Sequence, residues 1–145
     1  MRESLVVFRL GDERYAVPLD LVRELGRVPR LTVVPRLPPF VAGVANLRGH
    51  VLGVVDMRVL LTSSAGEGSR RMLVLQHDDI AVGVIVDAVD GVVDVESDMD
   101  SAVATLPDWL RPHVRGHVHD GLSSVAVLDP SLLAALQARA ETEAA

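Results

Sequence analysis

The chain has 145 residues, of which 49% are hydrophobic and 23% charged, and it contains no cysteine. This length predicts one compact domain or two small interlocked ones, and the hydrophobic content excludes a disordered chain. No apolar run approaches the roughly 18 residues needed to cross a bilayer, so we expect a cytoplasmic protein without direct membrane insertion. The lack of cysteine excludes disulfides, thiolate nucleophiles and thiolate metal sites.

The charge is distributed unevenly along the chain. Residues 1–71 carry 11 Arg against 7 acidic residues, whereas residues 72–145 carry 3 Arg against 13, so the halves are +4 and −10. This asymmetry indicates either two faces that meet different partners or two halves that attract each other. A nucleic-acid partner is disfavoured, because the net charge is −6 and the chain holds only two Phe, one Tyr and one Trp for base stacking.

Short apolar and alternating runs dominate the chain and predict an all-β fold with short helices. The predicted strands are Ser4–Leu10, Arg14–Pro18, Leu31–Val34, Val44–Leu47, Val51–Val55, Arg71–His77, Ile80–Val86, Gly91–Val95, Val114–His119 and Val125–Leu128. A turn or two of helix is expected at 20–25, about one turn at 57–61, and a longer helix at about 130–140. Asp129 and Pro130 are typical of the start of that last helix. The polar stretch 62–69 predicts a connection between two halves.

The two halves of the sequence resemble each other. Gly43 is followed thirteen residues later by Asp56, and Gly116 is followed at the same spacing by Asp129. The opening hairpins of the halves are also similar, at an offset of about 65. We interpret this pattern as a duplicated unit of two hairpins and a short helix, giving two small β-barrels. Because about 70 residues are near the limit for an independent core, we expect the barrels to share one.

No arrangement of residues predicts catalysis. The chain lacks a nucleophile elbow, a nucleotide-binding glycine pattern and a Walker lysine, since all of its basic side chains are arginines. We therefore predict a protein that is not an enzyme and holds no cofactor. The cluster His113, His117 and His119 offers one alternative, a zinc-type metal site or ligand-binding barrel, with Asp120 as the nearest further ligand.

The most distinctive segment runs from Pro38 to Arg58. Within it, Asn-Leu-Arg-Gly at 46–49 separates two apolar runs, which predicts a tight turn in which Gly49 adopts a positive φ. Arg48 is then held at or beside a hairpin tip. An exposed arginine on a rigid turn is well suited to anchor a protein surface, because its guanidinium group hydrogen-bonds carboxylates with little loss of entropy.

The chain resembles the CheW family of chemotaxis coupling proteins over nearly its whole length. The matching stretches are Phe8–Tyr15, Val22–Leu25, Pro38–Gly49, Val54–Arg58, Gly83–Val89 and Val127–Asp129. The string Gly-Val-x-Asn-Leu-Arg-Gly at 43–49 is the most specific of them. Gly53 departs from the pattern, since the family commonly has proline there.

The resemblance implies a single CheW-like domain at 1–145, built from two interlocked SH3-like five-stranded β-barrels around a shared core. It also implies a non-catalytic adaptor. The partners it implies are the regulatory domain of a CheA-type histidine kinase and the cytoplasmic tip of methyl-accepting chemotaxis receptors, with recruitment to membrane receptor arrays. The partner-binding positions that it carries over are Val22, Glu24, Gly43, Asn46, Arg48 and Gly49, of which Glu24 and Arg48 are expected to pair.

Two further alternatives stay open at this point. The first is a CheW-like scaffold that serves a kinase pathway other than chemotaxis, such as pilus, gliding or surface motility. The second is a decayed relative that folds but no longer couples, against which the retention of Glu24 and Arg48 argues.

Overall fold

A computed structural model describes residues 2–62, 71–96, 106–119 and 124–142 of the protein. The described elements are β1 (Arg2–Leu10), β2 (Glu13–Pro18), η1 (Leu19–Leu21), β3 (Val22–Arg27), β4 (Val41–Leu47), β5 (His50–Asp56), α1 (Met57–Thr62), β6 (Arg71–His77), β7 (Ile80–Val86), β8 (Ala88–Glu96), η2 (Arg111–His113), β9 (Val114–His119), β10 (Ser124–Leu128) and α2 (Leu132–Thr142). Strands dominate because the sequence alternates apolar and polar residues in short runs.

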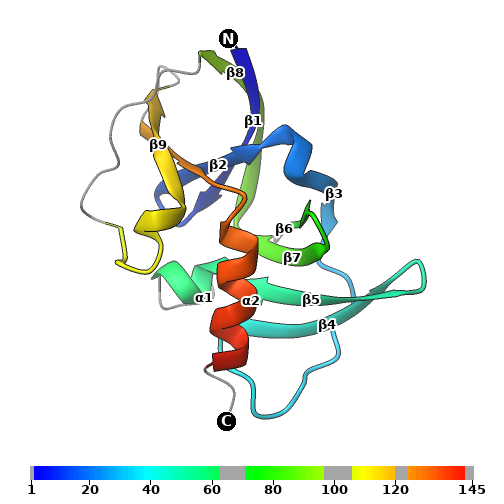
Figure 1. Ribbon diagram of the computed structural model, residues 1–145. Coiled ribbons are helices and arrows are strands. Elements are labelled where there is room, and N and C mark those ends of the chain that lie inside the picture. The colour runs from blue at the N-terminus through cyan, green and yellow to red at the C-terminus, as the bar shows by residue number, and fades with distance from the viewer. Residues whose placement is uncertain (1, 63–70, 97–105, 120–123, 143–145) are drawn as a thin grey trace.

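The strands form two five-stranded sheets, and each sheet draws on both halves of the chain (Figure 1). The order of the first sheet is β8-β1-β2-β10-β9, and that of the second is β3-β6-β7-β5-β4. The first sheet thus combines the opening hairpin with the last three strands. The second combines β6 and β7 with β3, β4 and β5. The prediction of two similar five-stranded units is confirmed, and the units interlock by exchange of strands between the sequence halves.

The registers show that the duplication extends to irregular details. In the second sheet a bulge on β4 lies between Val41 and Gly43, just before the Gly43↔Val54 pair. In the first sheet a bulge on β9 lies between Val114 and Gly116, just before the Gly116↔Val127 pair. Both pairs are related by the offset of 73 residues, and both glycines have a positive φ, of 145° and 153°. A bulge is a specific feature of a strand pair rather than a general property of valine-rich hairpins. Its repetition at equivalent positions therefore confirms the repeat.

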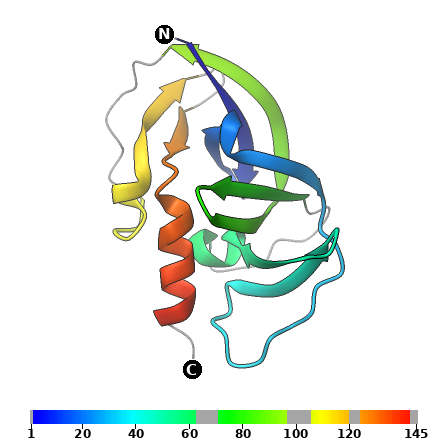
Figure 2. The same cartoon turned by 45° about the vertical axis from the view of Figure 1, so that its right-hand side comes forward.

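Three clusters of buried apolar residues fill the molecule. The largest lies between the two sheets and includes Phe8, Tyr15, Leu73 and Leu133. A second cluster belongs to the first sheet, with Val7 and others, and a third belongs to the second sheet. Because the largest cluster takes side chains from both sheets and from α2, the expected shared core is confirmed. Figure 2 shows α2 running beside the second sheet, although it follows a strand of the first.

Two local predictions were wrong. The segment 20–25, expected to be helical, is a single 3-10 turn at Leu19–Leu21 followed by strand β3. The run Leu31–Val34 is not a strand, because only Thr32 pairs with the sheet, through a bridge to Val44. Pro29 and Pro35 flank this run and cannot donate ladder hydrogen bonds, which explains why pairing stops after one bridge.

The other helices agree with the sequence within two residues. The Asp129 carboxylate accepts a hydrogen bond from the Ser131 backbone N–H at 2.9 Å, just before α2 begins. Such a bond satisfies one of the backbone donors left free at a helix start, as expected for an acidic residue at this place. None of the helices in the described residues combines the length and the apolar character that crossing a bilayer requires.

A buried ion cluster fastens the sheets together at the start of α1. Arg58 is only 1% exposed, and its guanidinium group contacts Asp56 at 2.8 Å and Asp87 at 3.3 Å. The hydrogen bond to Asp56, more than the opposing cost of burial, raises the pKa of Arg58, so its charge is permanent. Asp87 also accepts the backbone N–H of Gly11 at 2.6 Å. The cluster therefore joins the end of β5, the link between β7 and β8, and the first hairpin turn.

Candidate functional site: the hairpin end of the second sheet

The β4–β5 hairpin ends in a two-residue turn with both residues in the left-handed region. Leu47 pairs with His50, and between them Arg48 has φ 52° and Gly49 φ 86°. Positive φ at both central positions is the mark of a type I′ turn, which suits the twist of a hairpin. The side-chain oxygen of Asn46 accepts the backbone N–H of Gly49 at 3.0 Å. Asn46, given in the sequence analysis as a partner-binding position, therefore also holds the turn.

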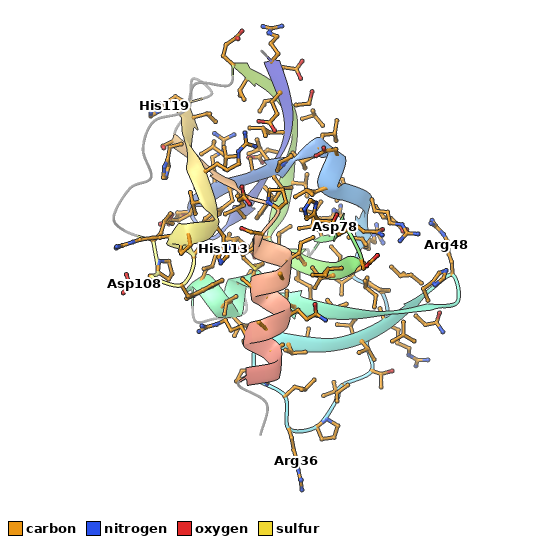
Figure 3. All side chains as sticks on the ribbon, in the orientation of Figure 1. Arg36, Arg48, Asp78, Asp108, His113 and His119 are labelled. Carbon is orange, nitrogen blue, oxygen red and sulfur yellow. The ribbon has the colours of Figure 1, made fainter. Side chains whose placement is uncertain are left out.

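Arg48 and Glu24 form the predicted ion pair. Arg48 Nη2 lies 3.1 Å from Glu24 Oε1, and Nη1 donates to Oε2 at 3.4 Å, which is a two-point contact. The Arg48 side chain is 81% exposed and that of Glu24 is 34% exposed. Glu24 comes from β3 and Arg48 from the tip beyond β4, the strands at the two ends of the sheet order. The pair therefore bridges the ends of the curled sheet, and Figure 3 shows Arg48 at the hairpin tip.

A surface cavity of about 230 Å³ lies beside this ion pair. Its lining combines an apolar floor with a charged rim and consists of Arg23, Glu24, Leu47, Arg48, His50, Val51, Leu52, Val74 and Ala81. Arg23 is fixed by a hydrogen bond from Nη1 to Gln76 Oε1 at 2.8 Å. An apolar hollow with ordered guanidinium groups at its edge suits a protein side chain flanked by polar atoms.

The six predicted site residues fall into two groups. Glu24, Asn46, Arg48 and Gly49 meet at the hairpin end, as described above. Val22 begins β3 two residues before Glu24 and packs, half-buried, against the shared core. Gly43 is buried in the bulge of β4, where a Cβ atom would lie 2.5 Å from the Thr32 carbonyl oxygen. Gly43 thus fixes the path of the neighbouring segment instead of lying on the surface with Arg48.

The sequence analysis missed three residues of this surface. Val51 is 75% exposed and Leu25 is 50% exposed, which is unusual for large apolar side chains, and Arg23 lines the cavity. The prediction of 20–25 as helix concealed the alternation of β3, in which Arg23 and Leu25 face outward. A strand assignment there would have placed both residues on the exposed face.

The three histidines of the alternative metal site, all within the described residues, do not come together in the structure. Figure 3 shows His113 and His119 at opposite ends of β9. His113 Nδ1 lies 2.7 Å from Ser131 Oγ, and His117 between them is buried. Within residues 2–62, 71–96, 106–119 and 124–142, no three His, Asp or Glu side chains come together as an ion would require. Asp120 lies outside the described residues.

Comparisons with known proteins agree with this arrangement. A family model of the CheW-like domain matches residues 4–138. The chain is 36% identical to the chemotaxis protein CheW of Rhizobium meliloti (strain 1021) over 116 residues, covering 78% of this chain and 75% of that protein. It is 34% identical to Protein PilI of Pseudomonas aeruginosa over 119 residues, covering 80% and 67%.

A solved structure is also similar. The crystal structure of the scaffolding protein TtCheW from Thermoanaerobacter tengcongensis aligns with a TM-score of 0.78 at 25% identity, covering 89% of this chain and 85% of that one. The two interlocked five-stranded sheets agree with that neighbour, and the family match spans both of them and most of α2. The chain belongs to the CheW-like domain family.

Proposed function

We propose that this protein is a non-catalytic adaptor that couples chemoreceptors to a CheA-type histidine kinase in chemotaxis signal transduction. Membership of the CheW-like family, matched over residues 4–138, is the observation that carries this conclusion. The partners are the regulatory domain of the kinase and the cytoplasmic tip of the receptors. The protein would then work in the cytoplasm, recruited to receptor arrays at the membrane.

The hairpin end of the second sheet supplies the physical basis for binding. Arg48 is exposed, yet its backbone is held by the type I′ turn and its side chain by Glu24. A side chain ordered before binding loses little entropy when a partner contacts it. The neighbouring exposed Val51 adds apolar surface to the same end. We therefore place Glu24, Arg48 and the turn residues Asn46 and Gly49 in the contact.

The two proposed contacts use different parts of the fold. The resemblance to the CheW family implies that the kinase regulatory domain is itself a barrel of the same fold. In this proposal the end of one sheet docks that barrel, and the surface between the sheets takes a receptor helix. Each contact can be weak, because an array links many copies and the weak contacts add through effective concentration. Val22 and Gly43 act in this proposal by shaping the elements that carry the surface.

The test is a titration of the wild type and Arg48→Glu against the cognate kinase regulatory domain and, separately, a receptor cytoplasmic hairpin. We expect saturable binding of the wild type to both and weaker binding of Arg48→Glu. An exposed ion pair contributes only about 0.2–1 kcal/mol to folding, so the variant should keep its melting temperature within a few degrees.

A matched control is Arg2→Glu, which reverses the charge of another exposed arginine, paired with Glu96 at 3.4 Å on the first sheet. It should bind like the wild type. If the folded wild type binds neither partner, the proposed function is wrong. A large fall of the melting temperature in Arg48→Glu would instead show that the role of Arg48 is structural.

A CheW-like scaffold in a kinase pathway other than chemotaxis is the second candidate. The similarity to Protein PilI, at 34% identity, favours keeping it, because the relatives of this chain are not all named for chemotaxis. Purification of the protein with its native kinase distinguishes the two: recovery of a chemotaxis kinase supports the first proposal, and recovery of a different kinase supports the second.

A further inference from the structure

A long stretch of the second sheet carries positive charge without any acidic residue. Between residues 25 and 55 the sequence contains Arg27, Arg30, Arg36 and Arg48 but no Asp or Glu, in a chain whose net charge is −6. Glu24, just before this stretch, neutralises Arg48. Arg27, Arg30 and Arg36 are exposed, and within the described residues none of them has an ion-pair partner.

The pairing of β3 with β6 brings a fourth arginine to this positively charged surface. Arg27 on β3 lies directly opposite Arg71 on β6, and Arg71 also lacks an ion-pair partner in the part of the chain that the structure describes. Like charges directly opposite each other on neighbouring strands are unfavourable. Their repulsion is relieved when an anion approaches both, so this pair favours a negatively charged ligand.

The segment that follows β3 presents this charge together with apolar surface. Val33 is 75% exposed and Val34 is 37% exposed, whereas Leu31 and Val28 of the same segment pack against the core of the second sheet. The Thr32–Val44 bridge attaches the segment to β4 with hydrogen bonds of 2.8 and 2.9 Å. The two valines are therefore presented outward from an anchored segment.

The backbone of this segment is also restricted. Four prolines lie between residues 29 and 39, and Arg36 has a φ of 68°, which is uncommon for a residue with a side chain. Figure 3 shows Arg36 pointing outward from the connection between β3 and β4. A segment restricted before binding loses little entropy when a ligand binds.

We propose that this basic strip, defined as Arg27, Arg30, Val33, Val34, Arg36 and Arg71, binds an extended acidic segment of the kinase regulatory domain. The proposal rests on the adaptor function and assigns a second contact to it, apart from the hairpin end. Guanidinium groups pair with carboxylates in two-point hydrogen bonds, and the valines contact apolar side chains between them. A strand or loop of a barrel provides such an extended segment, whereas the receptor tip is a helical hairpin.

A membrane surface fits the strip less well. Binding to anionic lipid typically uses an amphipathic helix with aromatic or leucine side chains on its apolar face, or a longer run of basic residues. The strip is an irregular segment with two valines and alternates charge with apolar surface. We therefore argue for a protein ligand and make lipid binding an outcome of the test.

The test compares the wild type with Arg30→Glu/Arg36→Glu in titrations against the kinase regulatory domain at low and high salt. We expect the affinity of the double variant to fall about tenfold at low salt and its salt dependence to flatten, because the charges at the edge of an interface govern the association rate. Arg2→Glu/Arg9→Glu, which makes the same change of charge on the first sheet, is the matched control and should retain wild-type affinity.

Arg27→Glu provides a variant whose fold is expected to be retained. It places opposite charges across the β3–β6 pair and is expected to raise the melting temperature by about 1–2 °C. A stabilised variant that nevertheless binds the kinase domain more weakly supports the strip. Wild-type affinity in both Arg27→Glu and Arg30→Glu/Arg36→Glu would overturn it.

The outcomes separate the strip from the adaptor function. Failure of the wild type to bind the kinase domain contradicts the proposed function itself. Kinase binding that is lost in Arg48→Glu but intact in the strip variants keeps the function and overturns the strip. Weaker binding of the strip variants to the receptor hairpin alone, or to phosphatidylglycerol vesicles alone, overturns the assignment to the kinase in favour of that ligand.

Discussion

At the scale of single residues, Arg48 carries a conformational cost that an ordinary surface arginine avoids. A φ of 52° is unfavourable for a residue with a Cβ atom, and glycine or asparagine would relieve it. The turn nevertheless keeps arginine there, supported by Asn46 on the backbone side and Glu24 on the side-chain side. Strained residues persist where the surroundings over-determine them, often at binding sites. This agrees with a role for Arg48 beyond folding.

Tyr15 gives a prediction on the dependence of stability on pH. Burial, together with the negative charge of Glu13, raises the pKa of Tyr15 to about 12. In the unfolded chain the pKa is about 10, so above that pH the unfolded state loses the proton first. The contribution of Tyr15 to the free energy of unfolding should therefore be constant below about pH 9 and fall above about pH 10, by up to about 1.4 kcal/mol per pH unit until pH 12.

Denaturant unfolding at about pH 9 and about pH 11 measures this effect. The interpretation is unusually direct because the chain has no Lys or Cys and a single Tyr, so no other side chain titrates in that interval. Tyr15→Phe is the control, since it keeps the ring that stacks on Phe8, with ring centroids 6.0 Å apart, and removes only the titrating hydroxyl group. An equal loss of stability in this variant would show that the effect has another origin.

At the scale of elements, the bulge in β4 gives a second prediction. Gly43→Ala should lower the free energy of unfolding by about 2 kcal/mol or more, because φ is 145° and the new Cβ would meet the Thr32 carbonyl oxygen at 2.5 Å. Gly53→Ala on β5 is the matched control, as nothing lies within 4 Å of its Cβ position and its φ is not positive. It should be neutral or slightly stabilising.

Chemical denaturation of both variants checks the prediction, and equal stability of Gly43→Ala and the wild type would contradict it. Binding gives a second readout. Displacement of Thr32 moves the segment that carries Arg30 and Val33, so a folded Gly43→Ala should also bind the kinase regulatory domain more weakly than Gly53→Ala does.

The helices and strands show which features can be predicted from one sequence and which cannot. The hairpins were predictable because their alternation and turns are local, and the ion pair of Glu24 with Arg48 followed from the family pattern. Segment 20–25 was not predictable, because its six residues fit the helical repeat of about 3.6 residues as well as the strand repeat of two. Only the pairing with β6 makes 22–27 a strand. The opposition of Arg27 and Arg71 depends on a register between distant segments, which no local pattern contains.

At the scale of the whole molecule, the exchange of strands makes each half of the chain incomplete. The first sheet needs β1 and β2 from the first half, and its parallel contact of β2 with β10 joins the two halves. The second sheet has the equivalent parallel contact, of β5 with β7. The Asp56–Arg58–Asp87 cluster adds a buried charged contact between the halves, and a buried pair is costly to break when one partner is removed.

We therefore propose that the chain folds as one unit, and fragment complementation tests this. Fragments 1–66 and 67–145, prepared separately, should each lack cooperative unfolding, because each exposes the apolar surface that the other covers. Mixed together, they should regain the circular dichroism and the melting transition of the intact chain, with a midpoint that rises with concentration. Fragment 1–66 carries 9 Arg and 6 acidic residues, and fragment 67–145 carries 5 Arg and 14, so their net charges of +3 and −9 favour association.

The buried ion cluster supplies the control for this experiment. Fragment 1–66 carrying Arg58→Met removes the cation that pairs with Asp87 of the other fragment and leaves only the hydrogen bond from Gly11, so reassembly should require a higher concentration than with wild-type fragments. Cooperative folding of either fragment alone would contradict the interlocked arrangement, because it would mean that one sequence half can complete a barrel from its own strands. If reassembly depends on Arg58, the contacts between the two halves of the chain hold the two sheets together.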